Sequence, residues 1–420
     1  MRRLKIAVAA VLVLGVLGLP VMSAPGGKPT TPTTSTVNMK KAVPNQVIVV
    51  PKQGLDPEDL KSSLSNIHGT IVDTTTNDGL TCYLVQIDAA AFEQSVKDLK
   101  KDKNFSIVQR NLQGKKKRQD KPFNGAPDDP EFSQQYQFAQ MNVLEAWKQD
   151  ATGRIRVGII DDGVLGTQAD LRPRVERGFN VPLNRPGGDT PDPVKSDHGT
   201  FCATCFGATT NNRLLGASPA YSSDIVPVNV FNDSTGNVDD FTIIKGIQWL
   251  QSQKIKLANM SLNQDDPEYY SNQQEHPALF AVFVNYHKNG GLLFNAAGNE
   301  STYDPNPRTK NLIVIAGTNA QSQPYSGTNF GKSVWFAAPG EDVASSNIYS
   351  RAEISNGTSF ACPLACSIAA LIWSANPSLT NDQVLEIMRK TATKPPGYTP
   401  NYYGHGIPNA GAAVKMALEE

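Results

Sequence analysis

Four short polar motifs, each beside an apolar segment, constrain this chain most strongly. The apolar run at 155–160 ends at Asp161, and the apolar run at 292–294 is soon followed by Asn299. The other two motifs open segments of small and apolar residues suited to closely packed helices, and they carry His198 and Ser359. Polar groups at the ends of buried strands lie where open α/β sheets place their ligands. The pattern therefore predicts one site assembled from four distant segments.

Each motif alone has an ordinary structural interpretation, such as a strand-ending turn or a helix N-cap. Together they follow the order aspartate, histidine, asparagine, serine along the chain. Aspartate, histidine and serine in that order are one of the known arrangements of a catalytic triad. Ala361 stands where the nucleophile elbow G-x-S-x-G has its second glycine, which excludes an α/β-hydrolase.

Residues 44–110 form a small unit of their own. A β-branched run at 46–50 predicts a strand, and apolar residues spaced by three or four predict helices near 60–67 and 92–99. The predicted order is strand, helix, strand, strand, helix, strand, which is the ferredoxin-like α+β arrangement. That fold alone indicates no function. The basic run at 115–118 follows it, in a linker that a protease could reach.

The N-terminus has the pattern of a signal peptide. Basic residues precede 14 uncharged, apolar residues at 6–19, fewer than the ~20 of a membrane span. Small residues up to Ala24 offer a cleavage point, although Pro25 would hinder cleavage there. An uncleaved N-terminal anchor is the alternative. Residues 25–37 are a Pro/Thr linker, which we expect to be extended.

Composition and charge narrow the possible partners. The chain is 39% apolar and 19% charged, which excludes a wholly disordered protein. Net charge is zero, but residues 1–118 hold 17 basic and 9 acidic side chains, and residues 119–420 hold 22 and 30. An acidic main body argues against nucleic acid as a partner. We expect no membrane association after signal removal, and a monomer.

The combined motifs resemble those of the subtilisin-like serine proteases, the subtilase family. The resemblance rests on IIDDGV at 159–164, HGTFCA at 198–203 and NGTSFACP at 356–363. It extends to the stretches at 126–130, 259–262, 336–340 and 403–406. It implies an α/β fold with a doubly wound, mainly parallel sheet, and it matches the preceding ferredoxin-like unit to the family's inhibitory propeptide.

The resemblance also implies a division of the chain. We expect a signal peptide at 1–24, a linker at 25–37, an inhibitory propeptide domain at 38–114, a basic processing linker at 115–125 and a catalytic domain at 126–420. The product would be a secreted endopeptidase made as a zymogen that removes its own propeptide. Its partners would be protein or peptide substrates and that propeptide, acting as an intramolecular inhibitor.

Residue roles follow from the same resemblance. Ser359 would be the nucleophile, His198 the general base, Asp161 the residue that orients the base, and Asn299 an oxyanion donor. The substrate-binding residues would be Ser261, Leu262, Asn263, Ala297 and Gly298. A catalytically silent surface or binding protein on the same fold is the alternative. An altered triad residue would favour it, and none is altered.

Some positions depart from the usual family pattern. Asn263 stands where glycine is usual, so the wall of the S1 pocket differs. Asp197 replaces the glycine before the histidine; it could raise the pKa of His198 or cap the turn, and we favour the cap. Asp162, Cys202 and the stretch 363–365 resemble the kexin and furin branch, which cleaves after paired basic residues. No β-sandwich domain follows, so basic specificity is the less favoured option.

Five cysteines and one aspartate bear on metals. Cys82 lies in the expected propeptide, and two predicted helices carry Cys202, Cys205, Cys362 and Cys366. Buried thiols or one interhelical disulfide suit such helices better than zinc, whose structural ligands usually come from turns. The family resemblance implies structural calcium instead. Asp170 matches one ligand position, and the short, uncharged loop at 209–212 resembles another.

Overall fold

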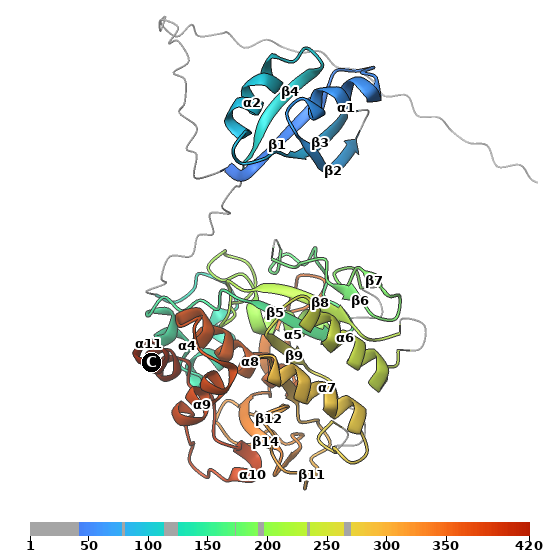
Figure 1. Cartoon of the computed structure of the whole chain (residues 1–420). Coiled ribbons are helices and arrows are strands. Elements are labelled where there is room, and N and C mark those ends of the chain that lie inside the picture. Colours follow the sequence, from blue (N-terminus) through green and yellow to red (C-terminus); the bar gives the residue numbers. More distant parts are fainter. Residues whose placement is uncertain are drawn as a thin grey trace, which may run out of the picture. The chain divides into compact units, whose positions relative to one another are not determined.

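The computed structural model describes residues 42–77, 80–112, 125–172, 174–191, 197–232, 236–263 and 270–420. The chain forms two compact units, residues 1–118 and 119–420 (Figure 1). The expected signal peptide, the Pro/Thr linker and the basic run at 115–118 lie outside the described residues.

The first unit has the predicted order of elements. These are β1 (Ala42–Pro51), α1 (Pro57–Ser65), β2 (Thr70–Asn77), β3 (Leu80–Gln86), α2 (Phe92–Lys101) and β4 (Phe105–Leu112). Its sheet is antiparallel with the order β2-β3-β1-β4, as in a ferredoxin-like fold. Alternate residues Val47 and Val49 of β1 face the two helices and share one buried core with Leu64, Val96 and Leu99.

An eight-stranded sheet is the centre of the second unit. In spatial order its strands are β14 (Val334–Pro339), β12 (Ile313–Thr318), β10 (Leu292–Ala296), β9 (Leu257–Met260), β5 (Arg156–Asp161), β8 (Asp224–Asn229), β6 (Phe179–Asn180) and β7 (Arg185–Pro186). Every neighbouring pair is parallel except β6 and β7. The inner strands are buried almost throughout, as expected when helices cover both faces. The prediction of a doubly wound parallel sheet is confirmed.

Helices cover the two faces of this sheet. Gly158 of β5 faces Leu250 of α6 (Asp240–Ser252), and a Cβ on that glycine would lie 2.5 Å from the leucine. Asp161 is an odd number of residues further along and faces α5 (His198–Gly207) on the opposite side. α7 (Pro277–Lys288) packs against α6, whereas α8 (Thr358–Ala375) packs against α5 and α11 (Ala410–Glu419) (Figure 1).

Shorter elements surround the sheet. They are α3 (Gln137–Gln140), α4 (Val143–Trp147), α9 (Asn381–Thr391), α10 (Pro400–Tyr403), a 3-10 turn at Phe132–Gln134, and the strand pairs β11 (Tyr303–Asp304) with β13 (Phe330–Gly331) and β15 (Val343–Ser346) with β16 (Ala352–Ser355). Within the described residues, α8 alone is long and apolar enough to cross a membrane, but 83% of that stretch is buried in the fold. A helix that is apolar all round and buried is the core helix of a globular unit.

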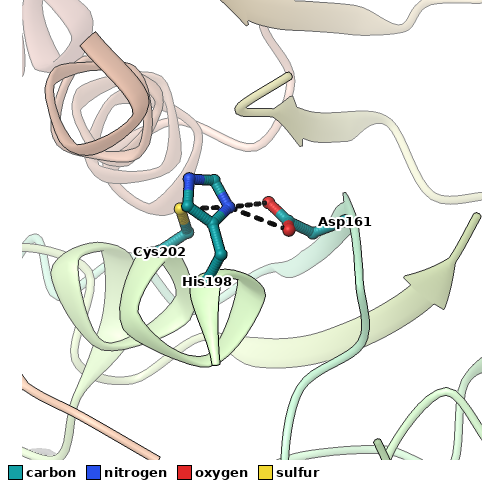
Figure 2. Close-up of side chains that lie close together, drawn as sticks. All are labelled: Asp161, His198 and Cys202. Atoms are coloured by element: carbon teal, nitrogen blue, oxygen red, sulfur yellow. Dashed lines mark hydrogen bonds and ion pairs between the residues drawn. The ribbon is translucent and has the colours of Figure 1, made fainter. Parts of the chain in front are cut away.

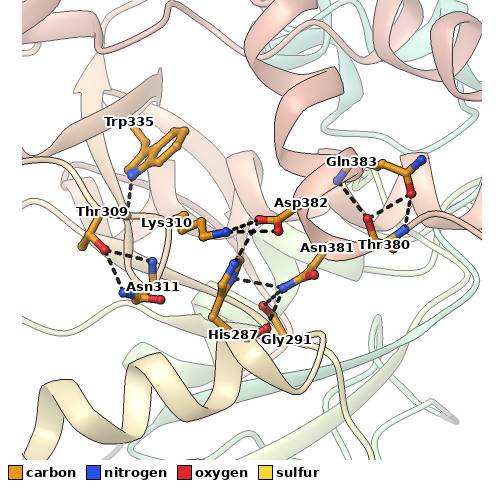
Figure 3. Close-up of polar contacts among 10 residues, drawn as sticks. All are labelled: His287, Gly291, Thr309, Lys310, Asn311, Trp335, Thr380, Asn381, Asp382 and Gln383. Carbon is orange, nitrogen blue, oxygen red and sulfur yellow. Dashed lines mark hydrogen bonds and ion pairs between the residues drawn. The ribbon is translucent and has the colours of Figure 1, made fainter.

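A buried polar cluster ties the end of α7 to the start of α9 (Figure 3). The Asn381 amide nitrogen lies 3.0 Å from His287 Nδ1 and donates to the carbonyls of His287 and Gly291 at 2.9 Å. Because carbonyls only accept, the amide must present its N–H groups, so Nδ1 accepts and the ring proton sits on Nε2. Nε2 lies 3.1 Å from Asp382, which also binds Lys310. Burial lowers the pKa of His287.

This cluster makes stability depend on pH. The pKa of an unfolded histidine is about 6.5, so below that pH the unfolded state binds a proton that folded His287 resists. The free energy of unfolding therefore decreases as the pH is lowered below about 6.5, by up to ~1.4 kcal/mol per pH unit. His287→Gln should flatten the fall in unfolding free energy between pH 7 and 5, measured by urea denaturation with Ser359→Ala present throughout to prevent degradation. His68→Gln, at an exposed histidine, is the control. Equal slopes in all three proteins would contradict this assignment.

Candidate active site

The carboxyl ends of three adjacent strands carry predicted site residues. Asp161 ends β5, Ser261 directly follows β9, and Asn299 comes three residues after β10. These strands are neighbours and run parallel, so the residues after them lie along one edge of the sheet. This is the edge where open α/β sheets place their ligands.

Asp161 and His198 form a close pair at this edge. His198 is the first residue of α5, and its Nδ1 lies 2.9 and 3.0 Å from the two carboxylate oxygens of fully buried Asp161 (Figure 2). The approach depends on Gly199. A Cβ at that position would lie 2.3 Å from the Gly163 carbonyl oxygen and 2.8 Å from Asp161 Cβ. A larger residue would push α5 away from β5.

The cap of α5 differs from the sequence prediction. Asp197 precedes the helix, is exposed and makes no side-chain cap hydrogen bond, so the preferred role for it was wrong. Instead Asp162 Oδ1 accepts from the Gly199 N–H at 2.8 Å. The reason is geometric, because the turn after β5 brings Asp162 against the first turn of the helix. A carboxylate there also complements the positive end of the helix dipole.

Three ionisable groups, Asp161, Asp162 and His198, lie close together where β5 meets α5. Burial alone would lower the pKa of His198, but the Asp161 carboxylate attracts the imidazolium and accepts its Nδ1 proton, and the net result is a raised pKa. Burial, and then the charge of Asp161, raise the pKa of Asp162 to about 7. The histidine is thus held as a base that takes up a proton readily.

Ser359 is the second residue of α8, next to the same edge. Its hydroxyl donates to the Ser261 carbonyl at 3.3 Å, and its own carbonyl accepts from Ser261 Oγ at 2.7 Å. Among the described residues, no hydrogen bond joins Ser359 to His198. Cys202 lies beside both, with Sγ 3.9 Å from His198 Nδ1 and 3.4 Å from the Ser359 carbonyl oxygen. Catalytic hydrogen bonds often close only when substrate is bound.

Asn299 is oriented by the start of α8. Its Oδ1 accepts from the Thr358 N–H at 2.8 Å and from the Thr358 hydroxyl at 3.2 Å. An acceptor role for Oδ1 leaves the amide Nδ2 as the donor of this side chain. The orientation therefore suits a group that donates to a developing oxyanion next to Ser359.

The predicted substrate-binding residues come together around Gly298. Ser261, Leu262 and Ala297 are buried, and Asn263 is half-buried. Gly298 has a φ of +102°, and a Cβ there would lie 2.0 Å from Asn263 Nδ2. This close contact brings the segment after β9 against the segment after β10.

The cysteines are thiols. All five are free, and the four in the second unit are buried, so the buried-thiol interpretation is confirmed and the interhelical disulfide was wrong. Burial raises the pKa of Cys202. The possible ligand atoms of Asp161, His198 and Cys202 lie within 4.8 Å of one another. A thiophilic cation bound there would thus compete for atoms of the Asp161–His198 pair, and of the four cysteines weighed as zinc ligands only Cys202 belongs to this group of described residues.

Asp170 lies in a second polar site. It is fully buried, its Oδ1 accepts from Asn212 Nδ2 at 2.8 Å, and its Oδ2 is buried without a hydrogen-bond partner. Burial raises its pKa to about 7. Sequence reasoning missed Asp129, whose carboxylate accepts from the N–H groups of Asn211 and Asn212 at 2.7 and 3.0 Å. Two buried carboxylates from separate segments thus contact the same loop at 211–212, an arrangement that fits a hard cation such as Ca²⁺.

Comparison with known proteins identifies the family. A model of the subtilase family matches residues 153–406. The chain belongs to the subtilase family. It is 30% identical to subtilisin amylosacchariticus of Bacillus subtilis subsp. amylosacchariticus over 79% of this chain and 81% of the relative. It is also 30% identical to thermitase of Thermoactinomyces vulgaris, over 69% of this chain and 99% of that protein.

A solved structure has the same fold. A protease from Pseudoalteromonas arctica PAMC 21717 matches with a TM-score of 0.59 and 24% identity, over 70% of this chain and all of that one. This likeness shows the fold alone. The family and the relatives make this subtilase a serine endopeptidase, which leaves the alternative of a silent binding protein without support.

The raised pKa of His198 should appear in the pH dependence of peptide hydrolysis. Because the base must be neutral to act, kcat/KM should rise with pH through a midpoint above 6.5. Asp162→Asn keeps an acceptor for the Gly199 N–H but removes a negative charge, so the midpoint should move down by about 0.5–1 pH unit. Asp197→Asn, at the exposed neighbouring carboxylate, is the matched control. An equal or larger shift in that control would contradict the role given to Asp162.

The position of Cys202 predicts sensitivity to thiol reagents. An organomercurial bound to Sγ would displace the His198 ring, so activity should fall by at least about tenfold. Cys202→Ala should keep its activity in the presence of the reagent. Cys366→Ala, which removes a buried thiol of α8 in place of the α5 thiol, should remain sensitive. Activity assays after titration with the reagent test this. Resistance of the wild-type enzyme, or sensitivity of Cys202→Ala, would contradict it.

Proposed function

We propose that this subtilase is a secreted endopeptidase, made as an inactive precursor, that uses Asp161, His198 and Ser359 as its catalytic triad and removes its own N-terminal unit. The observation that carries the triad is the pairing of both Asp161 oxygens with His198 Nδ1, at the sheet edge that also holds Ser359. This pairing supports a ring with its proton on Nδ1 and Nε2 as the base.

The chemistry follows from these groups. Ser359 Oγ attacks the scissile carbonyl carbon while His198 Nε2 takes the hydroxyl proton, and the carbonyl oxygen becomes an oxyanion. Collapse of this intermediate breaks the C–N bond, and His198 gives its proton to the leaving amine. Water then attacks the acyl-enzyme by the same route. Asp161 keeps the ring oriented and stabilises the imidazolium.

Asn299 Nδ2 and the Ser359 N–H would stabilise the oxyanion. The orientation of Asn299 by Thr358 supports this role, because the donor is held in place before substrate binds. Removing one such donor costs about 3–4 kcal/mol of transition-state stabilisation. Extended substrate would pair its backbone with the segment from Ser261 to Asn263, which follows β9, and so form a strand alongside that segment.

The precursor proposal rests on the N-terminal segments. The first unit has its own hydrophobic core and is followed by the basic run at 115–118. Without Arg2, Arg3 and Lys5 of the signal peptide, residues up to 118 hold 14 basic and 9 acidic side chains, opposite in sign to the remainder of the chain. Such complementarity favours association of an inhibitor with its enzyme.

One variant tests both the triad and self-processing. Ser359→Ala should lower kcat by several powers of ten, and a serine-directed phosphonate should label the wild type at Ser359 but not the variant. In a host without other active proteases the variant should accumulate as an unprocessed precursor, detected by mass spectrometry. Labelling of the variant would refute Ser359 as nucleophile. Normal maturation of the variant would refute self-processing.

We also propose that Asp129 and Asp170 hold a structural Ca²⁺. The unpartnered Asp170 Oδ2 supports this, because a buried carboxylate oxygen without a donor is costly and a cation would satisfy it. In the Ser359→Ala protein, a hundredfold excess of Ca²⁺ over its Kd should add about 2.7 kcal/mol to the unfolding free energy. Asp170→Asn should abolish this gain. Asp197→Asn, at an exposed carboxylate, should keep it, and equal gains in all three would refute the site.

A further inference from the structure

A proline lies inside the helix that carries the proposed nucleophile. α8 begins at Thr358 and contains Pro363. In an α-helix each carbonyl accepts from the N–H four residues further on, so the usual partner of the Ser359 carbonyl would be the N–H of residue 363. Proline has no N–H, and its ring crowds that carbonyl. Ser359 therefore lacks one of the hydrogen bonds that its own helix would normally supply.

Two side chains from other segments replace this donor. Ser261 Oγ donates to the Ser359 carbonyl at 2.7 Å, and Cys202 Sγ donates to the same oxygen at 3.4 Å. A thiol is a weak donor, and its contact here is also the longer one. Ser261 is therefore the main donor to this carbonyl, and Cys202 is a weaker second donor.

The proton of the Ser261 hydroxyl has a fixed direction. Asn259 Nδ2 donates to Ser261 Oγ at 2.9 Å, and both residues are buried. Since the amide supplies the proton of that contact, the hydroxyl proton is left for the Ser359 carbonyl. A buried hydroxyl that accepts on one side and donates on the other has little freedom to turn. Its bond to α8 is therefore kept in one geometry.

Ser261 also contacts the reacting group itself. Ser359 Oγ donates to the Ser261 carbonyl at 3.3 Å. The two serines thus form a reciprocal pair, in which the hydroxyl of each bonds the main-chain carbonyl of the other. Ser261 directly follows β9, a fully buried strand in the middle of the eight-stranded sheet. The pair therefore ties the start of α8 to the central sheet.

The Ser359 carbonyl also joins the nucleophile to the helix of the base. Cys202 belongs to α5, whose first residue is His198, and its Sγ lies 3.9 Å from His198 Nδ1. The carbonyl thus receives one donor from the segment after β9 and one from α5. A nucleophile and its base must be held in a productive geometry, and a displacement of about 1 Å can cost a hundredfold in rate.

We propose that Ser261 is a positioning residue for the Ser359 nucleophile, and that its hydroxyl replaces the helical donor that Pro363 removes. This inference rests on the proposed function, in which the segment after β9 has only a substrate-pairing role. Loss of the hydroxyl would leave the Ser359 carbonyl with the weaker thiol, so the first turn of α8 would be held less firmly. Attack by Ser359 Oγ would slow, whereas the backbone that pairs with substrate would stay.

The test is a double-mutant cycle between Ser261→Ala and Pro363→Ala. In the wild-type background, Ser261→Ala should lower kcat by at least about fivefold and change KM by less than about twofold. Pro363→Ala returns an N–H that can donate to the Ser359 carbonyl, so in that background Ser261→Ala should lower kcat by less than about twofold. An equal loss of kcat in both backgrounds, or a loss expressed in KM alone, would overturn the proposal.

A buried hydroxyl elsewhere in the same helix provides the matched control. Ser367 is fully buried, and its hydroxyl donates to the Leu364 carbonyl at 2.6 Å. Ser367→Ala should keep kcat within about twofold of the wild type. A loss in this control equal to that in Ser261→Ala would overturn the proposal. The same holds if Ser261→Ala lowers only the urea midpoint of unfolding and leaves the kcat of the folded enzyme unchanged.

Phosphonate labelling separates this proposal from the proposed function. The rate at which wild-type Ser359 is labelled reports the nucleophile without a peptide substrate, and Ser261→Ala should slow it by at least about fivefold. An unchanged labelling rate in Ser261→Ala would overturn the positioning role and leave the endopeptidase intact. Absence of labelling in the wild type would overturn the proposed function, and the positioning role with it.

Discussion

The catalytic edge depends on how closely the start of α5 approaches the end of β5. Gly199 has no Cβ, and this absence lets the helix lie against the Gly163 carbonyl and Asp161. From that contact follow the position of His198 and the pairing of its Nδ1 with both carboxylate oxygens. Since α5 packs against α8, the same contact also sets where Ser359 lies relative to the histidine.

A carboxylate buried at the end of β5 loses its hydration, so hydrogen-bond donors of the protein must replace the water. Asp161 is fully buried, and it accepts from His198 and from the Asp162 N–H at 2.8 Å. Asp162 in turn accepts from the Gly199 N–H at the helix start, and this contact offsets part of the effect of burial and of the Asp161 charge, which together raise its pKa. An arrangement in which each polar group is satisfied by the next is rigid, and rigidity is what a positioned base requires.

The same physics explains the two other polar sites of the second unit. At Asp170 and at the pocket of Asp304 and Asn295, a buried oxygen lacks a donor within the protein. Such groups are costly to keep, so they mark places where something from outside completes the hydrogen bonding. At the first site, two carboxylates from separate segments contact the loop at 211–212 and suit a metal ion, whereas the second site is a cavity of about 10 Å³ with room for one water molecule.

Local patterns in the sequence determined the fold class, the element order of the first unit and the identity of the residues along the catalytic edge. Strand runs, helical spacing and short motifs depend only on near neighbours, so they can be interpreted without a structure. Tertiary structure alone decided that Asp162, and not Asp197, caps α5, that Asp129 joins Asp170, that the helical cysteines stay thiols, and that Asp304 lies in the pocket beside Asn263. Most of these contacts join residues dozens of positions apart, and such distances are set by how the sheet and helices pack, which no local pattern encodes.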